Sequence, residues 1–415
     1  HDLIQSCKTL TEKLSNLQDS HIEFTLLRSC LSFSKIGYNL RTCPPSFISE
    51  AARTFDDLVS DSLSDIIASP ISPWSLSKAF LPVSLGGTGL RRASLHSPAA
   101  FLDSRFEAAP LVSSILGHEV STISPHLQEA FEGLSSCLDR NWSDIEDIDV
   151  PLRQRCLSRA IDEHLYASLL SSSPDPRSRA LVLSSSIPHA GDWLKIVPCS
   201  ALGLHLRDWL LSSIGSDSYG SSQLTVFDLQ QALDPFGDHF IECGGNGDRI
   251  SRHNALRDVI SASARIAALS PRLEVPSLIP GGRSRPADIF LPHWKRGLPA
   301  ALDVTVTSSL QAATIQSAST SQGHALKVAE SRKLAIHDHL CRAQGISFIP
   351  LAVEVLGGWS SLACSTLKDI ARMKDSRLGL SNSALLLFQQ LSITLWRSNA
   401  SMWVTRTGHY SLVCF

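Results

Sequence analysis

Two aspartates in apolar surroundings are the residues of this chain that most clearly suggest chemistry. Asp288 stands near the start of the apolar run 285–291, and Asp303 lies inside the run 299–306, which is rich in Ala, Leu and Val. Burial of a carboxylate is costly unless a cation or hydrogen bonds compensate its charge. Strands that carry these two groups, joined by a turn at 293–297, can bring them together to hold a divalent cation.

Basic residues cluster on both sides of the two aspartates. Between residues 244 and 340 the sequence contains twelve Lys and Arg against seven Asp and Glu, a net charge of +5, although the whole chain carries −2. A phosphate-rich transition state needs cations nearby, so this concentration favours a nucleic-acid partner for the region. The side chains that we expect to contact nucleic acid are Arg249, Arg252, His253, Arg257 and Lys327.

The elements that must position these groups are predicted in the order helix, strand, strand, helix, strand. A helix opens within 244–260, and Ala255, Val259 and Ala262 are predicted to form its inner face. The two aspartate-bearing strands follow, and a basic helix is predicted over 323–337. The last strand, predicted over 345–355, carries Glu354, which we expect either to support the site as a further acid or to face solvent.

The rest of the chain is predicted to be largely helical. Apolar residues recur at helical spacing through 1–70, and Ser-rich joints interrupt helical patterns between 106 and 215. The tail 361–415 is typical of two helices followed by a strand-like stretch at 402–405. The expected fold class is therefore α+β and multidomain, with helical N-terminal and linker regions followed by a small mixed α/β domain.

Composition excludes several classes of protein. The chain has 415 residues, of which 43% are hydrophobic and 18% charged, so it is long enough for a sizeable core and is not disordered throughout. No apolar run approaches the roughly 20 residues of a membrane helix, so no membrane partner is expected. Ten scattered cysteines without a Cys-x-x-Cys pair favour reduced thiols in an intracellular protein. The chain begins at His1 rather than Met, which favours a fragment of a longer protein.

Motifs near the N-terminus carry a resemblance to a known family. They include Leu40-Arg-Thr-Cys-Pro-Pro45, Gly86-Gly-Thr-Gly-Leu-Arg91 and Ser97-Pro-Ala-Ala-Phe-Leu102. The segment resembles the region after the palm in reverse transcriptases of non-LTR, LINE-like retroelements. The resemblance implies a thumb or post-palm remnant over 1–105 and a helical linker over 106–235. The aromatic-x-Asp-Asp turn of the polymerase palm is absent from the sequence, so we expect no polymerase activity.

A second set of motifs extends the resemblance toward the C-terminus. Arg252-His-Asn254, Arg285-Pro-Ala-Asp288 and Leu302-Asp-Val-Thr-Val306 follow one another in the order found in the restriction-enzyme-like endonuclease of site-specific non-LTR retroelements, a PD-(D/E)XK nuclease. The resemblance implies an endonuclease domain over 251–360, followed by a helical tail over 361–415.

The same resemblance implies roles for individual residues. Asp288 and Asp303 would bind Mg²⁺, and Lys333 would position the water or stabilise the pentavalent phosphate. In the wider superfamily the lysine stands two residues after the second acid, where this chain has Thr305. In this branch the lysine lies on the following helix, where Lys333 matches best and Lys327 is the second candidate.

A zinc site is not expected. In related elements an upstream Cys-x-x-Cys pair joins a His and a Cys to form a zinc knuckle, whereas this chain has only His239 and Cys243, and no cysteine from 212 to 233. Because a structural zinc site needs four ligands, 236–250 is interpreted as a degenerate knuckle, and zinc is not expected as a cofactor.

The leading hypothesis is thus a Mg²⁺-dependent DNA endonuclease fragment of a retroelement protein that nicks its target site. DNA is the expected partner, with element RNA as a second one, and the resemblance implies a nuclear location. Two alternatives stay open: a catalytically inactive remnant that still binds nucleic acid, and a helical scaffold with no nucleic-acid role.

Overall fold

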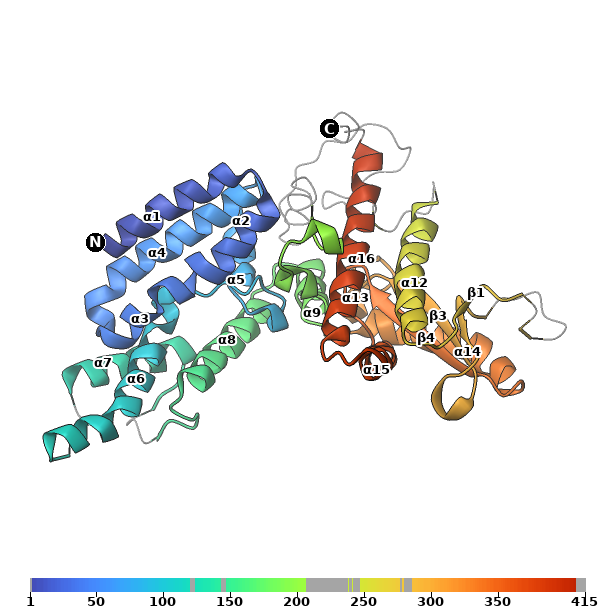
Figure 1. Cartoon of the computed structure of the whole chain (residues 1–415). Helices are drawn as coiled ribbons and strands as arrows, with labels where there is room; N and C mark the ends of the chain where they lie inside the picture. The colour runs from blue at the N-terminus through green and yellow to red at the C-terminus, as the bar shows by residue number, and fades with distance from the viewer. Residues whose placement is uncertain are drawn as a thin grey trace. The chain divides into compact units, whose positions relative to one another are not determined.

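The protein forms two compact units, residues 1–172 and 173–415. Most of the described chain is helical and one small sheet has four strands, which establishes the α+β class (Figure 1). None of the helices in the described part is both long and apolar enough to span a membrane. The computed structural model describes residues 2–119, 124–142, 147–206, 238, 241, 247–276, 278–279 and 286–407, with side chains as far as 403.

The described part of the first unit consists of helices joined by loops, without a strand. Helix α4 illustrates why: Pro45 opens it, and Phe55, Val59 and Leu63 recur at helical spacing to form a buried stripe. The helices of this unit are α1 (Asp2–Leu14), α2 (Ser20–Leu26), α3 (Phe33–Thr42), α4 (Pro45–Ile66), α5 (Pro73–Ala79), α6 (Ala93–Leu116), α7 (Pro125–Leu138) and α8 (Gln154–Ser171), with short helical turns at Ser15–Leu17, Leu27–Leu31 and Val83–Leu85.

The second unit contains the sheet and the predicted site. Its elements are α9 (Pro176–Ser185), α12 (Asp248–Ile266), β1 (Arg272–Leu273), β2 (Ile289–Leu291), β3 (Ala300–Thr307), α13 (Ile315–Ala318), α14 (His324–Arg342), β4 (Ser347–Glu354), α15 (Ser361–Leu378) and α16 (Ser383–Thr407), with short helical turns at Asp192–Lys195, Ser200–Leu202 and Lys295–Gly297. The predicted order of helix, strand, strand, helix and strand around the aspartates is confirmed.

The predicted strand at 402–405 is wrong, because these residues continue helix α16. The buried side chains of Trp396, Ala400 and Trp403 recur at helical spacing, so the helix keeps one apolar face in the core.

The segment that the sequence assigns to a linker, 106–235, is divided between the two units. Helix α6 runs across residue 105, and the chain as far as 172 packs within the first unit. Beyond that boundary, Ile187 packs with Ala352 of β4 in the second unit. Gly358 allows this close approach, because a Cβ atom there would lie 2.6 Å from the Cβ of Ile187.

The four strands form one mixed sheet in the order β1-β2-β3-β4. The β1–β2 and β2–β3 pairs are antiparallel, and the β3–β4 pair is parallel, with Asp303 opposite Pro350. Parallel neighbours need a crossover connection, and α14 supplies it between β3 and β4.

The two faces of the sheet pack against different helices. Leu302 and Val304 of β3 lie in the larger core, together with residues of α12, α15 and α16. Ala301 lies in a smaller core on the other face, together with Cys341 of α14. Since successive side chains of a strand point to opposite faces, Asp303 shares the face of Ala301 and points toward α14.

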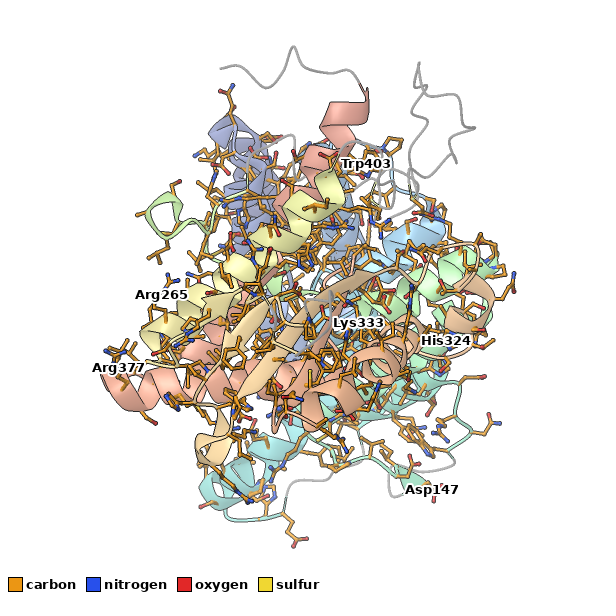
Figure 2. All side chains as sticks on the ribbon, turned by 90° about the vertical axis from the view of Figure 1, so that its right-hand side faces the viewer. Asp147, Arg265, His324, Lys333, Arg377 and Trp403 are labelled. Atoms are coloured by element: carbon orange, nitrogen blue, oxygen red, sulfur yellow. The ribbon has the colours of Figure 1, made fainter. Side chains whose placement is uncertain are left out.

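Helix α12 is rotated relative to its predicted orientation. The buried positions are Leu256, Ile260 and Ala264, whereas Ala262 of the predicted inner face is exposed. This stripe lies against α16, which runs beside α12 in Figure 1. At the far end of α12, the guanidinium of Arg377 donates to the carbonyl of Ile266 at 2.9 Å. Arg377 and the C-terminal end of α12 therefore lie at the same edge of the unit (Figure 2).

Candidate active site

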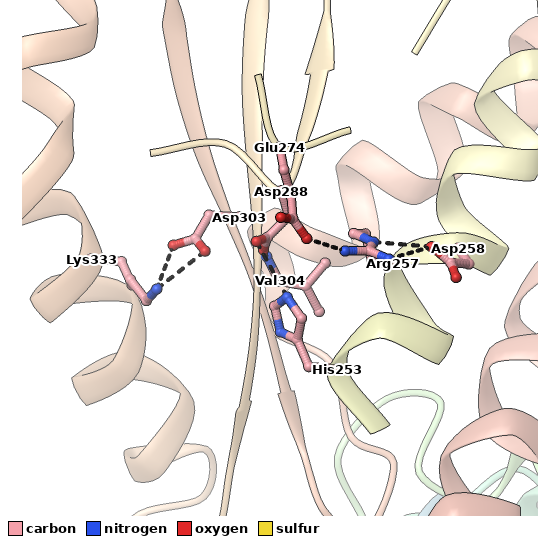
Figure 3. Close-up of polar contacts among 8 residues, drawn as sticks. All are labelled: His253, Arg257, Asp258, Glu274, Asp288, Asp303, Val304 and Lys333. Carbon is pink, nitrogen blue, oxygen red and sulfur yellow. Dashed lines mark hydrogen bonds and ion pairs between the residues drawn. The ribbon is translucent and has the colours of Figure 1, made fainter. Parts of the chain in front are cut away.

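An open cavity of about 500 Å³ lies where the second half of β3 extends past β2. Three elements surround it: the N-terminal turns of α12, strand β3 and helix α14, with Asp288 at the start of β2 (Figure 3). The residues that line it are Arg249, Ile250, Arg252, His253, Asp288, Asp303, Val304, Thr305, Val306 and Lys333. The structure thus brings Asp288, Asp303 and Lys333 into one cavity.

Asp288 is fixed by two hydrogen bonds from different elements. Pairing between β2 and β3 ends at Leu302, so the N–H of Val304 donates to Oδ2 of Asp288 at 2.6 Å instead of to a strand carbonyl. His253 Nε2 of α12 lies 3.2 Å from the other oxygen, Oδ1. Burial alone would raise the pKa of Asp288, but the hydrogen bond and charge of His253 and the N–H of Val304 hold that pKa below its usual value.

The contact between His253 and Asp288 also shifts the pKa of the histidine. The hydrogen bond to Asp288 raises the pKa of His253 above its usual value, although burial opposes the rise. The contact thus stabilises the protonated imidazole, which donates to the carboxylate, relative to a free histidine. Its role in the structure is to orient Asp288.

Asp303 is buried and faces the cation of Lys333. Lys333 Nζ lies 2.8 Å from Oδ2 and 3.1 Å from Oδ1 of Asp303. Burial raises the pKa of Asp303 to about 6; the charge of Lys333 opposes this rise, and the charge of Asp288 adds to it. The two carboxyl groups therefore interact directly.

A pair of carboxylates in one open cavity suits a hard divalent cation. Mg²⁺ prefers oxygen ligands and commonly takes only one or two carboxylates from a protein, with water and phosphate oxygens completing its shell. Asp288 and Asp303 provide that donor set, and the cost of placing them together is what a cation would relieve. Within the described ranges, no three His, Cys, Asp or Glu side chains gather as metal ligands.

The predicted basic cluster divides into residues with different surroundings. Arg249 is exposed at the cavity, whereas Arg252 is only 3% exposed and donates to Oδ1 of Asn399 at 2.8 Å. Arg257 lies outside the cavity lining and forms ion pairs with Asp258 and Glu274. Arg252 is thus an anchor of α12 on α16 rather than an exposed phosphate contact, and the charge of Arg257 is already balanced.

The two lysine candidates are separated by the structure. Lys333 lies at the carboxylate pair, near the middle of the face shown in Figure 2. Lys327 lies on the same helix but is exposed and does not line the cavity. Of the two candidates, Lys333 is therefore the one that lies beside the acids.

Glu354 neither lines the cavity nor faces solvent, the two positions expected for it. Its side chain is 0% exposed, and it accepts hydrogen bonds from the hydroxyls of Ser184 and Ser309 rather than lining the cavity. The prediction that it faces solvent is wrong. Glu354 is buried because α9, which carries Ser184 and is distant in the sequence, covers the end of β4.

Several residues of the site were missed in the sequence. Ile250 lines the cavity with 65% of its surface exposed, and Asn399 holds Arg252 from α16. An exposed Ile beside Arg249 is a signal that could have been noticed. Asn399 gives no such signal, because only tertiary packing brings α16 to α12.

Three residues named from the sequence motifs, His239, Cys243 and Arg285, lie outside the described residues. Neither a scan against protein-family models nor a search of curated proteins gives a match for this chain.

Proposed function

We propose that the second unit is a Mg²⁺-dependent DNA endonuclease of the PD-(D/E)XK type. The observation that carries the proposal is the meeting of Asp288, Asp303 and Lys333 in one open cavity. Phosphodiester hydrolysis needs acidic side chains that hold a cation and basic side chains that bind the phosphate. A carboxylate pair beside a lysine provides both. The cavity is open on one side, as a polymeric substrate requires.

Each side chain has a distinct task in this proposal. Asp288 and Asp303 would hold Mg²⁺, which supplies positive charge to the phosphodiester and to the attacking water. His253 keeps Asp288 oriented through its Nε2 hydrogen bond. Lys333 exchanges its contact with Asp303 for a phosphate oxygen and stabilises the negative charge that develops there.

Arg249 is the cation best placed to bind DNA outside the reacting centre. It is exposed, lines the cavity and forms no ion pair among the described residues. We assign it a backbone-phosphate contact, which contributes affinity without sequence preference. Lys327 is a more distant candidate for the same task, on the exposed side of α14.

The origin of the chain is part of the same proposal. Together with the sequence motifs, this site supports a fragment of a non-LTR retroelement protein that nicks target DNA in the nucleus. Element RNA is a second partner on this proposal, and polymerase activity is not part of it.

The decisive experiment is a nicking assay on supercoiled plasmid DNA with the full chain. We expect nicking that requires Mg²⁺ and that Asp303→Asn lowers by at least about 1,000-fold, since one of two carboxylate ligands is lost. The matched control is Asp338→Asn on α14, which removes a surface carboxylate paired with Arg342 and should leave nicking unchanged.

Equal nicking by the parent and Asp303→Asn would overturn the assignment of the site. Absence of nicking in both, with DNA binding that weakens steeply with salt, would instead establish an inactive nucleic-acid-binding protein. Absence of both activities would leave the scaffold alternative.

A further inference from the structure

The first unit contains a second cavity, of about 480 Å³, which the proposed nuclease function does not use. It is formed by α5 and Phe80, by the first turn of α6, and by the last turns of α8. Three of its lining side chains are aromatic: Trp74, Phe80 and His96. Its size falls in the range of about 300–1,000 Å³ that is typical of small-molecule sites.

Arg92 gives this cavity a positive charge. Its guanidinium carbon lies 4.9 Å from the centre of the Phe80 ring, a cation–π arrangement that holds the group in place. Among the described residues, no carboxylate lines the cavity and no ion pair involves Arg92. A planar guanidinium fixed against an aromatic ring is well suited to bind phosphate or carboxylate oxygens.

Asp56, the carboxylate whose charge interacts with Arg92, already accepts hydrogen bonds from other groups. Asp56 interacts with Arg92 through its charge. Its oxygens, however, accept from the N–H of Ala93 at 2.6 Å, and from the N–H and hydroxyl of Ser94 at 3.1 and 2.6 Å. Asp56 therefore caps the N-terminus of α6 and leaves the donors of Arg92 available to a ligand.

Two further polar groups at this cavity lack a partner. In the described part of the chain, Trp74 Nε1 and His96 Nδ1 are buried and form no hydrogen bond. His96 is 1% exposed, and its other nitrogen lies 3.4 Å from Asp162. The indole N–H of Trp74 is an unsatisfied buried donor that a ligand acceptor would satisfy, whereas His96 Nδ1 is an acceptor, because Nε2 of the same ring faces the Asp162 carboxylate.

We infer that this cavity binds a planar anion: an aromatic ring that carries a phosphate or a carboxylate. The ring would pack against Trp74, the partly exposed member of the aromatic lining, and the anionic group would bind Arg92. A nucleotide has this chemistry, whether free or at the 5′-phosphorylated end of a single strand. All the residues of this inference lie in the first unit, so it does not depend on the endonuclease proposal.

The test is isothermal titration calorimetry of the full chain with AMP, adenosine, inorganic phosphate and a 5′-phosphorylated oligothymidylate. We expect AMP to bind at least about 10-fold more tightly than adenosine or phosphate alone, because only AMP supplies both the ring and the charge. Arg92→Gln should weaken AMP binding at least about 10-fold. Arg105→Gln, on an exposed part of the same helix, should leave it unchanged.

A second variant separates loss of binding from loss of folding. Trp74→Phe keeps an aromatic ring but removes the indole N–H, so AMP should bind more weakly to a chain with unchanged circular dichroism. A stronger response to the oligonucleotide than to AMP would identify a strand end, and the reverse a free nucleotide. Failure of both to bind at millimolar concentration, or equal binding by Arg92→Gln, would overturn the inference.

Discussion

The ammonium group of Lys333 forms an ion pair with both carboxylate oxygens of Asp303, at 2.8 and 3.1 Å, and so connects α14 to β3. In the absence of a metal ion, the lysine provides the positive charge that the buried acid needs. In the proposed reaction, the two residues act on different partners: Asp303 on Mg²⁺ and Lys333 on the phosphate.

Replacement of Lys333 by Met should separate metal binding from catalysis. We expect Lys333→Met to bind Mg²⁺ at least as tightly as the parent, because a cation that competes for Asp303 is removed. Nicking should fall by about 100-fold or more, the effect of losing one charge-stabilising donor. Calorimetric titration with Mg²⁺ and the plasmid assay measure the two effects. Arg332→Met, which removes an exposed cation of the same helix outside the cavity lining, is the control, and an equal loss in both variants would contradict the assignment.

Asp303→Asn should fold at least as well as the parent without metal. The substitution removes a buried charge and its repulsion from Asp288, and Lys333 is exposed enough to reach solvent. Thermal unfolding in EDTA measures the change. A clear loss of stability would show that the ion pair stabilises the fold more than the burial of two acids destabilises it.

Arg252→Met should destabilise the protein by about 1.5–3 kcal/mol. The buried guanidinium donates to Asn399, whose amide in turn donates to the carbonyl of Val355 at 2.7 Å, so the substitution leaves a buried acceptor unpaired. Arg249→Met is the matched control, because Arg249 is exposed and its loss should change stability by no more than about 0.5 kcal/mol. Urea unfolding of both variants tests this contrast; equal effects would contradict it.

Glu354→Gln should change how stability depends on pH. Burial raises the pKa of Glu354 above its usual value, although hydrogen bonds from Ser184 and Ser309 oppose the rise. The folded state therefore retains this proton to a higher pH than the unfolded state. The contribution of Glu354 to stability is thus greatest below its unfolded pKa and falls as pH rises through the folded pKa.

Glutamine cannot ionise, so the stability of Glu354→Gln relative to the parent should increase as pH rises above about 4.5 and then level off. Each unit of pKa difference corresponds to about 1.4 kcal/mol. Urea unfolding between pH 4 and 8 measures the curve. A difference that does not vary with pH would show that Glu354 has the same proton affinity in both states.

Purified protein should contain less than one zinc ion per chain. His239 and Cys243 supply only two of the four ligands that a structural zinc site needs, and the sequence has no cysteine from 212 to 233. Elemental analysis after dialysis measures the content. Stoichiometric zinc would show that ligands distant in sequence complete the site.

The sequence by itself determined the elements around the site. Apolar runs that each contain one acid, 285–291 and 299–306, indicated the two strands, and the helical pattern 323–337 indicated the helix that carries Lys333. Local periodicity is sufficient for this, because the pattern of apolar side chains repeats within about two turns of a helix or about two pairs of residues in a strand. Because side chains alternate along a strand, Asp303 occupies the same face of the sheet as Ala301, two residues earlier.

Tertiary structure alone decided the orientation of α12. Its alternation of Ala, Ser and Arg gives no strong apolar stripe, so the sequence could not determine which side faces the core, and Ala255, Val259 and Ala262 were predicted. The structure buries Leu256 and Ile260; of the predicted face, Val259 packs partly buried against the same core, and Ala262 is exposed.

That rotation changes what the basic residues can do. Arg252 precedes Leu256 by four residues, so it continues the buried stripe and meets Asn399, whereas His253 turns toward Asp288. Arg257 turns to Asp258 and Glu274. Except for Asp258, the partners are distant in the sequence, and burial of a charged group is tolerated only where the fold brings a matching polar group to it.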